Sequence, residues 1–353
     1  MFRFLRTRTE VVLATVLTLA LAGCWVDKMP MPAAPENAGL AAVSDTFYVQ
    51  ISPVWGAETG YDFSSPSDVL LGREPLVYVA DTGNDRVVML DLAGNVLGVS
   101  QPVEHPIALA QDSKLRLLVA NGTNRLFRID LYAVHHDIAA APVDTLYWDI
   151  DHPHRQFTAV AAFLVRKRGK STIFYRATAT GPARNDNAIF AFGESGEYLG
   201  PANLEPNGTG IFAAASPSGI TAVEDWSEDF IFTQVGNNSF KVQWITTNPE
   251  IGLTPKLNPA DGPRDIFAIN KFDRPEDVTV DREKNIYVID AGLNRLLKFT
   301  SSGREMHSFG EFGSGERQFN HPQGVAFFDR TVYVADTGNN RIVRFKLSTD
   351  VGE

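Results

Sequence analysis

The side chains best suited to chemistry follow a short pattern that recurs along the chain. Five segments begin with a residue and a proline and continue into an apolar run: SPSDVLL from Ser65, HPIALA from His105, SPSGITAV from Ser216, RPEDVTV from Arg274 and HPQGVAF from His321. FTAVAAF from Phe157 is a sixth version that lacks the proline. A sheet tolerates proline at the first residue of a strand, so each of these proline-led segments predicts a short strand with polar side chains at its beginning.

These segments supply the candidate ligand-binding residues, which are Asp68, Glu276, Asp277, His321 and Gln323. The set is polar and mildly acidic and contains no cluster of arginines or lysines. Such a set suits a sugar, a peptide or a cation. The competing interpretation is a solvated surface that binds no ligand.

A second group with metal-binding chemistry lies between His135 and His154, where four of the seven histidines occur together with Asp137, Asp149 and Asp151. Imidazole nitrogens suit zinc or copper. The spacing matches no specific metal motif, however, and we favour a solvated loop. The chain also lacks a nucleophile elbow, a phosphate-binding glycine loop and an HExxH motif. We therefore predict no catalytic residue, no metal ligand and no cofactor, with a divalent cation as the alternative.

The elements that position these residues repeat along the chain. VYVADTGNDRVV at residues 77–88 and VYVADTGNNRIV at 332–343 are identical at ten of twelve positions. Related segments occur at 286–299, 117–130, 230–244 and 173–192. Each alternates polar and apolar residues or is wholly apolar around a turn, which predicts six β-hairpins, each preceded by a proline-led strand or its variant.

Charged residues frame the turns of the best-preserved hairpins. In ADTGNNR, Asp336 is placed to accept backbone N–H groups across the turn, and Arg341 is placed to fold back onto it as a charge-assisted pair. The predicted pairs are Asp336/Arg341, Asp81/Arg86 and Asp290/Arg295. We interpret them as fasteners of the hairpins, because they recur wherever the repeat is intact. A ring of binding charges is the alternative.

This combination of strand and hairpin resembles the NHL repeat, most strongly at residues 274–345, where SFGEFGSGERQFNHPQGVAF precedes VYVADTGNNRIVRF. The resemblance implies an all-β fold, namely a six-bladed β-propeller of four-stranded antiparallel blades. The last hairpin has no fourth strand after it, whereas DTFYVQISPVW at 45–55 is an unassigned strand. We predict that this strand pairs with the last blade and closes the ring, which would otherwise keep an open edge.

In the implied topology, the proline-led segments surround the mouth of a central channel. The residues expected to face the mouth are Ser67, Asp68, Ile107, Thr158, Ser218, Glu276, Asp277 and Gln323, with His105 and His321 just outside. The NHL-like amidating lyases carry histidine directly after the proline and bind zinc with three such residues, but no histidine stands at that position here. Lactonase-like propellers bind a divalent ion through oxygen ligands. Glu276, Asp277, Asp68 and Asn121 could supply these, although the motifs of that family do not match this chain.

The N-terminus resembles that of a bacterial lipoprotein. An apolar run at residues 11–22 follows three arginines, is too short to cross a bilayer and has the shape of a signal peptide. LAGC at 21–24 resembles a lipobox, which implies that Cys24, the only cysteine, is cleaved on its N-terminal side and lipidated. Trp25 after the cysteine favours sorting to the outer membrane if the source is Gram-negative.

We therefore expect a signal peptide at 1–23, a lipidated cysteine and flexible tether at 24–44, and the propeller at 45–353. The formal net charge of −10 disfavours nucleic-acid binding. The expected protein is a lipid-anchored, non-catalytic module in the cell envelope, facing the periplasm or the cell surface, that binds a protein or glycan partner. The alternative is a divalent-metal-dependent hydrolase or lyase with its site at the channel mouth. The oligomeric state stays open.

Overall fold

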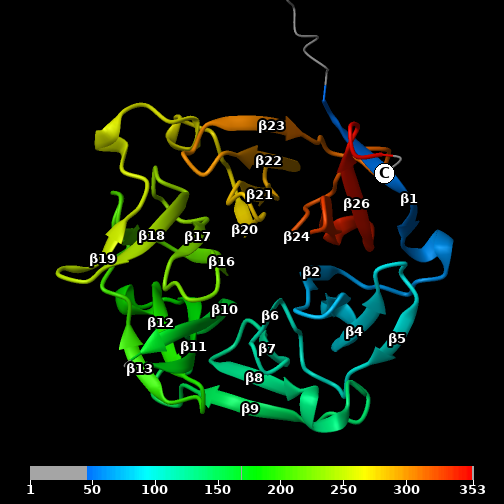
Figure 1. Cartoon of the computed structure of the whole chain (residues 1–353), viewed down its shortest axis with the longest axis horizontal. Helices are drawn as coiled ribbons and strands as arrows, with labels where there is room; N and C mark the ends of the chain where they lie inside the picture. The colour runs from blue at the N-terminus through cyan, green and yellow to red at the C-terminus, as the bar shows by residue number, and fades with distance from the viewer. Residues whose placement is uncertain (1–45, 168, 352–353) are drawn as a thin grey trace, which may run out of the picture. The chain divides into compact units, whose positions relative to one another are not determined.

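The six predicted hairpins and their preceding strands form six four-stranded antiparallel sheets (Figure 1). The structure is a computed structural model that describes residues 46–167 and 169–351. The predicted signal peptide and tether, with Cys24, therefore lie outside the described residues.

We number the sheets as blades 1 to 6 in chain order. Blade 1 consists of β2 (Pro66–Leu71), β3 (Leu76–Asp81), β4 (Arg86–Asp91) and β5 (Val96–Val99). Blade 2 consists of β6 (Ala108–Gln111), β7 (Arg116–Ala120), β8 (Arg125–Asp130) and β9 (Val143–Trp148). Blade 3 consists of β10 (Gln156–Lys167), β11 (Lys170–Thr180), β12 (Ala188–Gly193) and β13 (Tyr198–Pro201).

Blade 4 consists of β16 (Pro217–Ala222), β17 (Phe230–Gln234), β18 (Val242–Asn248) and β19 (Gly252–Pro255). Blade 5 consists of β20 (Pro275–Val280), β21 (Ile286–Asp290), β22 (Arg295–Phe299) and β23 (Glu305–Phe309). Blade 6 consists of β24 (Gly324–Phe328), β25 (Thr331–Asp336), β26 (Arg341–Leu347) and β1 (Tyr48–Trp55). Between blades 3 and 4, β14 (Glu205–Pro206) and β15 (Ala213–Ala214) form a short parallel pair.

The helices among the described residues are single 3-10 turns. They are η2 (Ala57–Thr59), η3 (Thr82–Asn84), η4 (Tyr132–Val134), η5 (Arg184–Asp186), η6 (Pro259–Asp261), η7 (Asp265–Phe267) and η8 (Thr337–Asn339). In the described part of the chain, no helix is both long and apolar enough to cross a membrane.

The first strand of each blade lines a central channel. β2 contacts β6 and β24, β10 contacts β6 and β16, and β20 contacts β16 and β24, so that the six first strands form a closed ring. The proline-led segments begin these strands and therefore meet at one end, the mouth. The loops between the first and second strands of the blades meet at the other end, which we call the far end.

The hydrophobic core lies mainly between neighbouring blades. Phe157, Tyr175 and Phe192 of blade 3 are fully buried and pack against residues of blade 2. Phe230 and Phe232 of blade 4 pack in the same way against blade 3. Burying one such aromatic side chain contributes roughly 1.5 to 3 kcal/mol, so each joint between blades holds its neighbours firmly in position.

Blade 6 is built from both ends of the described chain. β1 pairs antiparallel with β26, with Tyr48 opposite Leu347 and Ile51 opposite Arg344. Figure 1 shows β1, in blue, beside β26, in red. Trp55 at the end of β1 is fully buried. The predicted closure of the ring by an N-terminal strand is confirmed.

Candidate functional site

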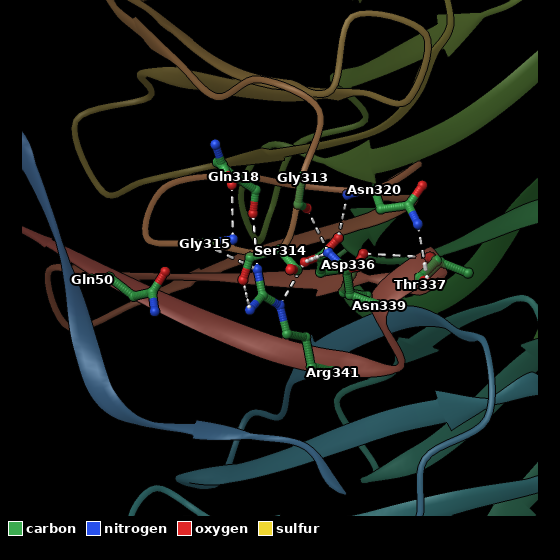
Figure 2. Close-up of polar contacts among 12 residues, drawn as sticks. Gln50, Gly313, Ser314, Gly315, Gln318, Asn320, Asp336, Thr337, Asn339 and Arg341 are labelled. Carbon is green, nitrogen blue, oxygen red and sulfur yellow. Dashed lines mark hydrogen bonds and ion pairs between the residues drawn. The ribbon is translucent and has the colours of Figure 1, made fainter. Parts of the chain in front are cut away.

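The hairpin turn of blade 6 holds Asp336 in a fully buried position (Figure 2). One carboxylate oxygen accepts the backbone N–H of Asn320 at 2.7 Å. The other accepts from Nδ2 of Asn339 at 2.8 Å and from Nε of Arg341 at 2.7 Å. The aspartate therefore ties the turn to the segment that leads into the same blade, because Asn320 lies shortly before β24.

The turn of blade 1 repeats this arrangement atom for atom. Asp81, also fully buried, accepts from the backbone N–H of Ser64 at 2.7 Å, from Nδ2 of Asn84 at 2.8 Å and from Nε of Arg86 at 2.7 Å. The two near-identical sequence segments thus make the same set of hydrogen bonds in neighbouring blades.

The third predicted pair, Asp290 with Arg295, differs from the expectation. The carboxylate of Asp290 is surrounded by three backbone N–H groups, those of Asp273, Arg274 and Leu293, at 2.8 to 3.0 Å. Leu293 stands where the other two turns have asparagine, and Nε of Arg295 donates to the carbonyl oxygen of Gly310 at 3.3 Å. Asp290 fastens its hairpin through the backbone alone.

The last residue of each of these turns fastens the next blade. These residues have left-handed backbone with φ of 52 or 53°. Their side-chain oxygens accept a backbone N–H at 2.7 or 2.8 Å from the residue before the next blade's proline, in the pairs Asp85 with His105, Asn294 with His321, and Asn340 with Ser65. The sequence pattern did not reveal these contacts, because they join residues of different blades.

The channel mouth is a cavity of about 630 Å³. All eight residues expected to face it line it, namely Ser67, Asp68, Ile107, Thr158, Ser218, Glu276, Asp277 and Gln323. His105 also lines the cavity. His321 does not line it: the side chain is exposed, and its Nδ1 lies 2.7 Å from Oδ1 of Asn320. Volumes of this size are typical of small-molecule sites.

Three of the lining hydroxyl groups hold blades together. Ser67, Thr158 and Ser218 each donate to the carbonyl oxygen of the proline in the next blade's proline-led segment, at 2.7 to 3.2 Å; these acceptors are Pro106, Pro217 and Pro275. Each hydroxyl also contacts a threonine hydroxyl of its own blade. Their hydrogen-bonding capacity is largely used within the protein.

Polar groups with remaining capacity gather on the side of blades 5 and 6. Glu276 is half-buried and accepts from Nε and Nη2 of Arg274 at 2.9 and 2.6 Å. Burial raises the pKa of Glu276, and the positive charge of Arg274 opposes this shift. Gln323 of blade 6 is half-buried, and its side chain makes no hydrogen bond to another described residue.

Asp68 and Asp277 form the inner limit of the mouth cavity and also line a smaller inner cavity of about 110 Å³. They occupy equivalent positions in blades 1 and 5, and each binds a backbone N–H of the following blade. Oδ2 of Asp68 accepts from Leu109 at 2.7 Å, and Oδ2 of Asp277 accepts from Val325 at 2.9 Å. A Cβ atom on Gly324 would lie 2.6 Å from Cα of Asp68, so this glycine allows blades 6 and 1 to approach.

The two carboxyl groups differ from ordinary aspartates in their ionisation. Burial raises the pKa of Asp68 to about 7. Burial also raises the pKa of Asp277 well above its usual value, and the negative charge of Asp68 adds to the shift. Asp68 is buried and Asp277 is half-buried, and two such neighbouring carboxyl groups resist being charged together. Near neutral pH this part of the channel therefore carries less negative charge than its sequence suggests.

In the described part of the chain, the candidate metal ligands do not form a metal site. Among residues 46–167 and 169–351, no group of three or more histidine, cysteine, aspartate or glutamate side chains could hold a metal ion. Asn121 binds the carbonyl oxygen of Glu104 and the hydroxyl of Thr123 instead. In the histidine-rich segment, Nδ1 of His152 lies 2.9 Å from Oδ1 of Asp149, and His136 lies near Glu74.

Comparisons with known proteins agree with this architecture. A family model of the NHL repeat matches residues 319–345. "NHL repeat-containing protein 3" of Homo sapiens is 31% identical over 185 residues, which cover 47% of this chain and 48% of the relative. "NHL repeat-containing protein 2" of Gallus gallus is 35% identical over 130 residues, which cover 35% of this chain and 17% of the relative. The chain thus matches less than half the length of either relative.

Solved structures with the same fold come from different functional classes. A Bacteroides thetaiotaomicron protein of unknown function has a TM-score of 0.61 at 12% identity, with 86% of this chain and 76% of that chain covered. An auxiliary nutrient binding protein from Bacteroides ovatus has a TM-score of 0.58 at 12% identity, with 86% and 77% covered. A luciferin-regenerating enzyme has a TM-score of 0.56 at 12% identity, with 87% and 96% covered.

At 12% identity these likenesses show the fold alone, whereas the repeat itself is recognisable in sequence. The matched repeat at 319–345 contains the turn that holds Asp336 and Arg341, and six such units close into a ring. This chain carries an NHL repeat at residues 319–345, is similar to NHL repeat-containing proteins over part of its length, and folds as a six-bladed β-propeller.

Proposed function

We propose that this protein is a non-catalytic binding module of the cell envelope that takes a polar partner, a glycan or a peptide segment, into the mouth of its channel. The observation that carries the proposal is the mouth cavity of about 630 Å³ with accessible polar groups on one side. A rigid ring of blades presents these groups at fixed positions, which favours selective binding.

The chemistry of the mouth supports a polar ligand without a large negative charge. Arg274 is the one lysine or arginine among the residues lining the cavity, and its guanidinium pairs with Glu276. The side-chain amide of Gln323 offers both a donor and an acceptor. Hydroxyl groups of a sugar and amide groups of a peptide require this mixture, whereas a phosphate-rich partner requires positive charge.

The fold neighbours give this proposal a precedent but no further detail. A protein described as an auxiliary nutrient binding protein uses the same fold. The identity of 12% limits that comparison to architecture. The hydrolase alternative requires converging metal ligands, and no observation of the described residues favours it over binding.

The test compares a variant of Gln323, which lines the cavity, with a variant of His321, which does not. Purified protein is screened against a glycan array and a peptide array, and the best probe is titrated by calorimetry. Gln323→Ala should weaken binding by roughly threefold to tenfold, because a hydrogen bond to the ligand is lost. His321→Ala is the control, because its side chain lies outside the cavity, and it should bind as the unaltered protein does.

A site in the mouth would be contradicted if Gln323→Ala, His321→Ala and the double variant Gln323→Ala with Glu276→Gln all bound the probe as tightly as the unaltered protein does. Absence of any glycan or peptide ligand, together with turnover of a lactone or ester, would favour the hydrolase.

A further inference from the structure

An ion pair joins two opposite blades at the far end of the channel. Arg73 follows β2 in blade 1, and Asp225 lies between β16 and β17 in blade 4. Nη1 of Arg73 lies 2.8 Å from Oδ2 of Asp225, and Nη2 lies 2.6 Å from Oδ1. Blades 1 and 4 are three places apart in a ring of six, so this bidentate contact lies across the far end.

Residues 223–229, which contain Asp225, form a strap with contacts to further blades. Nζ of Lys284 in blade 5 lies 2.6 Å from Oε1 of Glu224. The backbone N–H of Trp226 donates to the carbonyl oxygen of Leu164 in blade 3 at 2.6 Å. With Arg73 included, this one loop of blade 4 is bound to blades 1, 3 and 5.

The strap lies next to the inner cavity. This cavity of about 110 Å³ is lined by residues of all six first strands. Leu71 and Thr221 belong to its lining. Leu71 lies two residues before Arg73, and Thr221 lies two residues before Val223, the first residue of the strap. Thr279 lines the cavity from blade 5 and makes no hydrogen bond through its side chain to the described residues.

We infer that the strap closes the far end of the channel, so that the interior is reached from the mouth, and that the Arg73–Asp225 pair holds the strap in place. A bidentate contact between arginine and carboxylate fixes the relative position of the two groups. Arg73 also lowers the pKa of Asp225, so the carboxylate stays charged at neutral pH.

The closure is reversible rather than permanent. The side chains of Arg73 and Asp225 are 32% and 40% exposed, and pairs with this degree of exposure stabilise a structure only modestly. Thermal opening of the strap is therefore within reach, and loss of the pair shifts the balance further toward the open state. This inference does not depend on the identity of the ligand at the mouth.

Thiol labelling tests the closure directly. In a full-length Cys24→Ser background, Thr279→Cys supplies the one thiol, located in the inner cavity. A bulky dye-maleimide should react slowly with it, and about threefold to fivefold faster when Arg73→Ala or Asp225→Ala is added, because the far end opens more often. The charge exchange Arg73→Asp with Asp225→Arg should restore slow labelling.

A thiol at the mouth provides the matched control. Gln323→Cys in the same background should react quickly and at the same rate with or without Arg73→Ala. Two results would overturn the inference: equal labelling of Thr279→Cys with and without the ion pair, or labelling that stays fast after the charge exchange although each protein melts at the same temperature.

Discussion

Asp336 and Asp81 bind a backbone N–H of the segment that leads into their own blade, in addition to the asparagine and arginine of the turn. Both carboxylate oxygens of Asp336 and of Asp81 accept hydrogen bonds from groups of the protein itself. A carboxylate that is fully buried and satisfied in this way contributes to the hairpin and offers little to a ligand.

Removing either aspartate should therefore destabilise the protein and leave ligand binding intact. Asp336→Ala and Asp81→Ala should each lower the free energy of unfolding by roughly 1 to 3 kcal/mol, because a buried N–H and an arginine lose their acceptor. Chemical denaturation measures the change. Loss of binding at the mouth with unchanged stability would mean that the aspartates act as a ligand ring.

The arginines of the turns should not be equivalent. Arg341 binds Asp336 and also the carbonyl oxygens of Ser314 and Gln318, at 2.7 and 2.9 Å, whereas Arg295 binds Gly310 alone among the described residues, at 3.3 Å. Arg341→Ala should lower the melting temperature more than Arg295→Ala does. Equal shifts in a thermal denaturation experiment would show that the extra contacts of Arg341 add nothing.

The buried carboxyl groups of Asp68 and Asp277 should make stability depend on pH. Their pKa values are raised in the folded protein, so the folded state holds more protons than the unfolded state between about pH 4 and pH 7. Stability from these groups is therefore greatest at low pH and declines as the pH rises toward 7. The slope for each group is at most about 1.4 kcal/mol per pH unit.

Melting temperatures from pH 5 to pH 8 check this dependence. Asp68→Asn and Asp277→Asn should flatten the decline, because an amide does not ionise. Asp91→Asn serves as the control: Asn95 lowers the pKa of this half-buried carboxyl, so its contribution changes only at about pH 4 and below. An unaltered slope in both channel variants would place the titrating groups elsewhere.

Whole strands and hairpins were predictable from local sequence. The proline-led segments mark the beginnings of the first strands, as in HPQGVAF before β24, because proline at that position and the apolar run that follows are local signals. The segment at 45–55 is predicted to pair with the last blade, because no fourth strand follows the last hairpin in the sequence. Both inferences required only the repeat and the rule that an open edge must be covered.

Contacts between blades were not predictable in the same way. Arg73 and Asp225 are 152 residues apart, and nothing in the residues around either one names the other. Leu293 in place of asparagine is visible in the sequence, but its effect on Arg295 depends on where the backbone N–H groups of Asp273 and Arg274 lie. His105 and His321 occupy equivalent positions and share left-handed backbone, with φ of 51 and 50°, yet only His105 lines the cavity, and the local sequence does not distinguish them.

Deleting β1 should lower the melting temperature substantially. The deletion exposes the edge of β26 and also removes Tyr48 and Trp55, which are 2% and 0% exposed, so the apolar surface that these side chains cover becomes accessible to water. Differential scanning calorimetry of a chain that begins after Trp55 provides the measurement. An unchanged melting temperature would mean that three strands suffice for blade 6.

For the molecule as a whole, a lipid anchor at Cys24 is predicted from the sequence alone and would determine where the propeller is located. Cys24→Ser should release the protein from the membrane fraction or leave the leader uncleaved, because the site of lipid attachment is lost. Fractionation followed by mass spectrometry of the N-terminus distinguishes these outcomes. Normal membrane recovery of the variant would refute lipidation at Cys24.

The pairing of β1 with β26 also sets the order of events during biosynthesis. The first strand to be translated, β1, can pair only after β26 has been synthesised, about 300 residues later. At typical rates of synthesis this takes on the order of 15 to 60 s. Over this interval the nascent chain holds an unpaired strand at its leading end, and blades 1 to 5 can form before their ring closes. A chain that ends before β26 therefore lacks the partner of β1, and its ring of blades stays open.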